Sequence, residues 1–260
     1  MNDIKSSGTP AVNELISKYS PFIIEIRKRI LLTLAVFAGG MVFGFIFYEK
    51  IIKLVIDILS LKGINIVFTS PFQFINLAIS CGVATGLVLV FPLLIYQILS
   101  FLKPALREKE YRMIVGFLPF SIFLFLSGFS FGVLVMKWQI EIFLARSISL
   151  DIGNILDISR LLSTVLLTSM LMGIGFQFPI ILLLLLGIGI IKHDQLSKNR
   201  QWVYLGSFIF AVLLPPDSIL ADILLTLPLI ILFEITLILN RIFRKNSTKR
   251  IKEHLGLPSN

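Results

Sequence analysis

Residues 25–48 read Glu-Ile-Arg-Lys-Arg and then ILLTLAVFAGGMVFGFIFY, which places three basic side chains directly before an uncharged run at residues 30–48. At about 1.5 Å per helical residue, this run can cross a hydrocarbon core about 30 Å thick. Basic residues resist translocation, so the charged end is expected to stay on the cytoplasmic side. The stretch therefore predicts a membrane-spanning helix and its orientation.

Five further apolar runs repeat this pattern along the chain. The predicted spans are residues 30–48, 72–100, 113–136, 161–191, 202–214 and 219–239. Pro92 is expected to kink the second span and Pro179 to break or tilt the fourth, while Pro119 is expected inside the third. The fifth run is only about 20 Å long as a helix, well short of a full core, and Pro215-Pro216-Asp217-Ser218 forms the turn after it.

The basic residues alternate with these runs and predict which loops stay inside. Eighteen of the 24 Lys and Arg residues lie before the first run, between the second and third, after the fourth, or after the sixth. The fold expected is all-α: a polytopic membrane protein of six transmembrane helices with both termini inside. Its parts are a cytoplasmic segment at 1–29 with an interfacial helix bent at Pro21, a membrane domain at 30–240, and a basic tail at 241–260.

Composition agrees and excludes other classes. The mean hydropathy is +0.93 and 56% of residues are hydrophobic, far above a soluble domain. A net charge of +9 is compatible with nucleic acid, but its segregation by loop favours anionic lipid, so no nucleic-acid partner is expected. The single cysteine, Cys81, and the isolated His193 and His254 form no metal motif, so neither a metal nor a cofactor is expected.

Few residues within the spans have polar or ionisable side chains that could serve a function. Asp222 and Glu234 in the sixth span are the intramembrane carboxylates that a proton-coupled carrier of a small solute would need, and a structural anchor is a third possibility. Gln177, in the fourth span, either packs within the bundle or anchors an inserted signal or partner helix. No nucleotide-binding or protease motif is present in the sequence, so the protein is not expected to be an enzyme.

Two carboxylates stand among the basic residues of the inner loops. Glu25 precedes Arg29 by four positions, and Glu110 follows Arg107 by three. Taken alone, both spacings are typical of ordinary solvated helix pairs, each worth tenths of a kcal/mol.

Seven short motifs, in order along the chain, indicate that these carboxylates have a functional role. The motifs are Glu25-Ile26-Arg27-Lys28-Arg29, Ser70-Pro71-Phe72, Tyr96-Gln97 before Phe101, Pro104-Ala105-Leu106 leading to Glu110, Phe176-Gln177-Phe178-Pro179, Pro215-Pro216-Asp217 and Phe233-Glu234. In this six-span frame the chain resembles the TatC family, the receptor subunits of the twin-arginine translocase. Many bacterial members carry glutamate where Gln177 stands, whereas glutamine occurs in cyanobacterial and plastid relatives.

The resemblance implies a signal-peptide receptor. The positions of Glu25 and Glu110 would contribute to recognition of two adjacent arginines, with Arg27 and Phe101 shaping the site and Asp217 functional on the outer side. It also implies single-span TatA/TatB-type partners, self-association in a receptor complex, and export of folded proteins driven by the proton-motive force. The expected location is a bacterial inner membrane or a plastid thylakoid membrane.

Overall fold

The structure is a computed structural model that describes residues 10–59, 65–67, 70, 72–102, 116, 118–150, 155–187, 189–191, 193–215 and 218–254. The side chains at 10–22, 65–67, 99, 101–102, 118, 148, 155–156, 187, 193 and 242–254 are not among the described parts. Within these residues the chain is almost entirely helical. The elements are α1 Pro10–Ile46, α2 Tyr48–Leu59, β1 Asn65–Val67, α3 Gln73–Leu102, α5 Leu118–Ser149, β2 Ile155–Asp157, α6 Ile158–Gly175, α7 Phe178–Gly187, α8 His193–Lys198, α9 Arg200–Val212 and α10 Ile219–His254.

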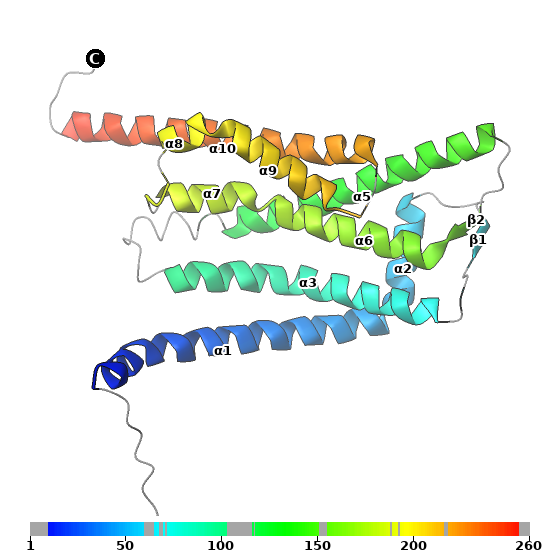
Figure 1. The fold of residues 1–260 in the computed structure, drawn as a ribbon, viewed down its shortest axis with the longest axis horizontal. Coiled ribbons are helices and arrows are strands. Elements are labelled where there is room, and N and C mark those ends of the chain that lie inside the picture. The colour runs from blue at the N-terminus through cyan, green and yellow to red at the C-terminus, as the bar shows by residue number, and fades with distance from the viewer. Residues whose placement is uncertain are drawn as a thin grey trace, which may run out of the picture.

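The long helices lie side by side along one axis, with α1 at one edge of the bundle (Figure 1). α1 packs chiefly against α3, which in turn contacts α6, whereas α10 packs against α9, α7 and α5. α1 begins, α3 ends and α10 ends at the same end of the molecule, while α2, β1 and β2 lie at the opposite end (Figure 1). We call the first the inner end and the second the outer end, after the orientation that the basic loops predict.

The helices confirm the predicted membrane architecture. Five described segments are long and apolar enough to span a bilayer: Ile23–Ile46, Gln73–Ile98, Pro119–Ser147, Ile158–Leu186 and Ile219–Arg241. The remaining run is α9, whose 13 residues fall short of a full crossing, as its sequence predicted. The fourth span is broken at Phe176 and Gln177, between α6 and α7, and Pro179 follows in the first turn of α7, where its ring removes one backbone N–H donor.

Several boundaries differ from the sequence-based expectations. The interfacial helix is not a separate element, because α1 runs without interruption from Pro10 into the first span. Pro119 directly follows Leu118, where the described part of α5 begins, and lies within the apolar segment Pro119–Ser147. α5 then continues to Ser149, well past residue 136, and α10 continues past the sixth apolar run to His254.

Two features at the outer end were not predicted. α2 is an amphipathic helix whose Val55 and Leu59 are buried against the bundle. β1 and β2 form a short parallel pair in which Asn65 is opposite Ile155 and Val67 opposite Asp157. The pair ties the loop before α3 to the loop before α6.

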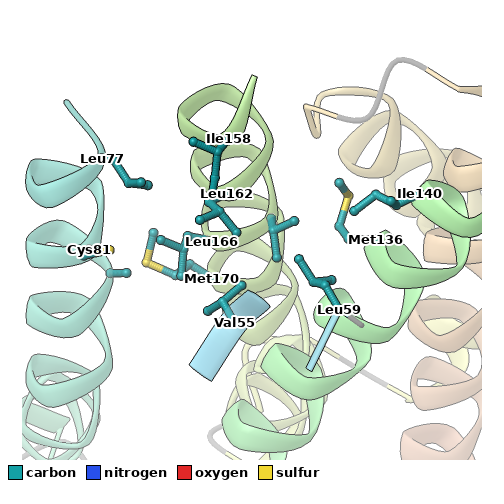
Figure 2. Close-up of a cluster of buried hydrophobic side chains, with 12 residues drawn as sticks. Val55, Leu59, Leu77, Cys81, Met136, Ile140, Ile158, Leu162, Leu166 and Met170 are labelled. Atoms are coloured by element: carbon teal, nitrogen blue, oxygen red, sulfur yellow. The ribbon is translucent and has the colours of Figure 1, made fainter. Parts of the chain in front are cut away.

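The main core lies where α2, α3, α5 and α6 meet (Figure 2). Leu77 and Cys81 of α3 face Leu162 and Leu166 of α6, and all four are at most 4% exposed. The buried Cys81 serves as a small packing residue in this cluster. A second cluster joins α5 and α6 to α9 and α10 through Met172, Ala211 and Leu225.

Close backbone approach characterises the contact between α1 and α3. A Cβ atom on Gly40 would lie 2.9 Å from Gly86 Cα, and one on Gly82 would lie 2.7 Å from Met41 O. A Cβ on Gly44 would meet Thr85 at 2.6 Å. Each helix thus carries a small-xxx-small pair, Gly40 with Gly44 and Gly82 with Gly86, which lets two apolar helices pack without bulky side chains between them.

Candidate functional site

A polar cluster joins the inner ends of α1 and α3. Arg29 Nε donates to Glu25 Oε1 at 3.2 Å, and Arg29 Nη2 donates to the same oxygen. From the other side of the guanidinium, Nη1 donates to Gln97 O at 2.7 Å and Nη2 to Ser100 Oγ at 3.2 Å. Arg29 therefore connects the Glu25 carboxylate to the last turns of α3.

This arrangement leaves Glu25 accessible. Its side chain is 50% exposed, whereas that of Arg29 is 22% exposed. Both described hydrogen bonds to Glu25 use Oε1, so no described residue occupies Oε2. The carboxylate is held in place by one oxygen and can accept a hydrogen bond from an incoming donor through the other.

Thr33 and Gln97 continue the polar contact toward the membrane. Thr33 Oγ1 lies 2.7 Å from Gln97 Oε1 and 2.9 Å from Arg29 O, and its single proton serves one of them at a time. Gln97 is 9% exposed, and its Nε2 is buried with no hydrogen-bond partner in the described part of the chain.

The other predicted recognition residues are only partly described. Arg27 is exposed on α1, two positions from Glu25. Phe101 lies in the last turn of α3, directly after Ser100, but its side chain is outside the described residues. Glu110 and Asp217 lie outside the described residues altogether. The structure thus brings Glu25 and the backbone of Phe101 to the same end, and the roles predicted for these residues stay predictions.

Gln177 lies between α6 and α7 and is 6% exposed. Ser121 Oγ of α5 donates to Gln177 Oε1 at 2.6 Å, and Gln177 Nε2 donates to Ser121 O at 3.1 Å. Both ends of the amide are paired within the bundle, at the point where the fourth span is broken. This contact favours the packing interpretation of Gln177.

The carboxylates of the sixth span do not form one site. Tyr204 Oη donates to Glu234 Oε1 at 2.5 Å, and Arg200 Nη1 lies 3.3 Å from Glu234 Oε2, so Glu234 connects α10 to α9. Asp222 lies twelve residues earlier on α10, about 18 Å away along the helix. Among the described residues, no three His, Cys, Asp or Glu side chains are placed to hold a metal ion.

Sequence reasoning missed the residues that position Glu25. Arg29 was seen only as its helical neighbour, and Ser100 was not singled out, because their contact joins positions 71 residues apart. Gln97 stood in one of the seven motifs without a role. The glycine spacings at 40/44 and 82/86 are a local signal that predicts close packing of two membrane helices.

Comparison with known proteins assigns the family. The sequence profile described as "Sec-independent protein translocase protein (TatC)" matches residues 21–228. The chain is similar to TatCy of Bacillus subtilis, with 30% identity over 234 residues covering 87% of this chain and 90% of that protein. It is similar to TatC of Escherichia coli, with 29% identity over 225 residues covering 85% and 87%.

The fold of a solved structure supports the same family assignment. The fold matches a crystal structure of the "Twin Arginine Translocase Receptor- TatC in DDM", with a TM-score of 0.75, 26% identity, and coverage of 84% of this chain and 98% of that one. Multiple apolar helices and bacterial relatives make the chain a multi-pass integral protein of the bacterial inner membrane. The chain belongs to the TatC family of Sec-independent protein translocase proteins.

Proposed function

We propose that this translocase component is the receptor for twin-arginine signal peptides, and that the peptide's arginines bind at the inner end, where α1 meets the end of α3. The observation that carries the proposal is Glu25: its accessible carboxylate is held through one oxygen by Arg29, and no described residue bonds to the second oxygen.

Guanidinium chemistry supports a preference for arginine. A guanidinium presents a planar fork of N–H donors that a carboxylate grips with charge-assisted hydrogen bonds, whereas a lysine ammonium offers only a point charge. A second carboxylate, Glu110, follows α3 in the next basic loop and would take the second arginine. Each of the two adjacent arginines would then bind one of the two carboxylates.

The rest of the proposal concerns the assembly. Single-span TatA/TatB-type subunits would join this receptor, copies of which would associate with one another, and the proton-motive force would drive export of folded cargo. The protein itself would act by binding rather than catalysis. The protein in the matching crystal structure is described as a receptor, which supports the same role here.

The rival, a proton-coupled carrier of a small solute, has less support. Such a carrier would gather ionisable groups at one intramembrane site. Glu234 is instead bonded to Arg200 and Tyr204, about 18 Å along α10 from Asp222. A purely structural anchor would leave the open carboxylate of Glu25 without a purpose.

The proposal is tested by charge substitutions measured against binding of a twin-arginine signal peptide to the purified protein. Glu25→Gln, which keeps a partner for Arg29, should weaken binding roughly 5- to 30-fold, corresponding to about 1–2 kcal/mol for one charge-assisted contact. Glu25→Lys and Glu110→Lys should weaken it further, because repulsion is added.

Glu49→Lys is the matched control. Glu49 is an exposed carboxylate in the first turn of α2, at the other end of the first span, and its reversal should leave peptide binding unchanged. Equal binding by all four variants and the unsubstituted protein would show that Glu25 and Glu110 are ordinary surface charges.

A further inference from the structure

An apolar groove runs along the contact between α1 and α3, starting at the polar cluster. Its volume is about 570 Å³, within the range of ligand sites. Its lining includes Ile26, Arg29, Thr33, Leu34 and Phe37 of α1 and Gln97 of α3. The groove belongs to α1, which lies at the edge of the bundle and packs chiefly against α3 (Figure 1).

The groove wall contains an unsatisfied polar group. Gln97 is nine-tenths buried, its Oε1 lies beside Thr33 Oγ1, and its Nε2 has no partner among the described residues. Burying an amide nitrogen without an acceptor is unfavourable, so an acceptor supplied from outside the protein would be bound there. Gln97 also lines the groove, so this donor lies next to an occupant that carries an acceptor oxygen.

Charge at the groove's inner end selects the occupant. At about 100° per residue, Arg27 projects from the flank of the groove, on the same side of α1 as Leu34, whereas Lys28 projects from the opposite side. Arg29 lines the groove itself, and Glu25, already bonded to Arg29, is the one acidic residue among positions 23–46 of α1. The flank of α1 that carries Arg27 therefore favours an anion at the level of the lipid headgroups.

The length of the groove favours a lipid acyl chain over a spanning helix as its occupant. From Ile26 to Phe37 it extends about 16 Å along α1, roughly half of a hydrocarbon core. A spanning helix would need a groove along the full thickness, whereas one acyl chain starting at the headgroup level needs only the inner half.

We infer that this groove is a binding site for an anionic phospholipid. One acyl chain lies along Thr33, Leu34 and Phe37, a glycerol ester carbonyl accepts a hydrogen bond from Gln97 Nε2, and the phosphate lies beside Arg27. The phosphate would share Arg27 with the proposed signal-peptide site, so the inference is tested with lipid alone and no peptide enters the measurement.

The test measures lipid retained by the purified full-length protein, by native mass spectrometry, with dioleoyl phosphatidylglycerol and dioleoyl phosphatidylcholine as probes. The unsubstituted protein should retain about fivefold more phosphatidylglycerol, because attraction of one anionic headgroup by a nearby basic residue is worth about 1 kcal/mol. Leu34→Trp should reduce retention of both lipids about tenfold by filling the groove. Leu32→Trp, at a comparably exposed position outside the groove, should not.

Two polar substitutions separate the two contacts. Gln97→Leu should lower retention of both lipids about fivefold, because both carry ester carbonyls, and should not unfold the protein, because it removes an unpaired buried group. Arg27→Gln should lower retention of phosphatidylglycerol to that of phosphatidylcholine. Lys28→Gln should leave retention of phosphatidylglycerol unchanged. Equal retention by the Leu34→Trp and Leu32→Trp proteins would overturn the inference. So would a Leu34→Trp protein that keeps its lipid but loses a single-span partner, since the groove would then be a helix site.

Discussion

At the scale of single residues, the contact between Gln177 and Ser121 shows how a polar side chain is accommodated inside an apolar bundle. The amide oxygen accepts from the Ser121 hydroxyl and the amide nitrogen donates to the Ser121 backbone carbonyl, so neither the amide nor the hydroxyl is left unpaired. The pair bridges α5 to the break between α6 and α7, where the fourth span has lost regular helical hydrogen bonds.

This pairing makes a prediction about coupling. A double-mutant cycle with Gln177→Leu and Ser121→Ala should give an interaction energy of about 0.6–1.7 kcal/mol, the range measured for such bonds in membrane bundles. Thermal unfolding in detergent is the measurement. Co-purification of single-span partners should be unchanged in Gln177→Leu. Strictly additive effects, or loss of partners without loss of stability, would assign Gln177 to partner binding instead.

The residue scale also shows where sequence reasoning stops. The helical pair of Glu25 and Arg29 was predicted from its spacing and is present. The bonds from Arg29 to Gln97 and Ser100 could not be predicted, because they depend on how α1 and α3 are docked. For Glu110 and Asp217, family resemblance remains the whole basis of the prediction.

At the scale of elements, the α1–α3 contact is sensitive to side-chain volume. It combines four closely approached glycines with the polar bonds of Arg29 at its inner end. α1 has no other extensive partner among the described elements, so its position depends on this single interface.

A matched pair of glycine substitutions tests the interface. In Gly86→Ala the new Cβ would lie 2.9 Å from Phe37 O, a backbone atom, so α1 and α3 must separate, and we expect a loss of about 1–3 kcal/mol. A Cβ on Gly39 meets nothing within 4 Å, so Gly39→Ala should be neutral or stabilising by up to about 1 kcal/mol. Thermal unfolding of both proteins in one detergent is the comparison. A stable Gly86→Ala protein would mean that the helices are packed less closely than the structure has them.

Element by element, prediction succeeded where hydropathy alone decides the outcome. The apolar runs, the break near Pro179 and the short α9 all followed from the sequence. The amphipathic α2 was overlooked, although Ile51, Ile52, Val55 and Leu59 repeat at helical spacing, because it is too short to span a membrane. β1 and β2 pair residues that are 90 positions apart, and three-residue strands carry no periodic signal.

At the scale of the whole molecule, the distribution of basic residues and the order of the helices agree on the position of the two termini. The basic segments predict both termini inside, and the start of α1 and the end of α10 do lie at one end of the bundle (Figure 1). Which side of the membrane that end faces stays a prediction, as does the function of the surface assembled there. Family membership identifies a translocase component, and the open carboxylate of Glu25 is what suggests its ligand.

Binding of paired signal peptides, identical except that the two adjacent arginines of one are lysines in the other, tests this account most directly. Charge is conserved between the peptides, so only the planar fork of the guanidinium distinguishes them. With the purified protein, we expect the twin-arginine peptide to bind at least about tenfold more tightly, which corresponds to about 1.4 kcal/mol. Equal dissociation constants for the two peptides would contradict the proposal that carboxylates at the inner end recognise twin arginines.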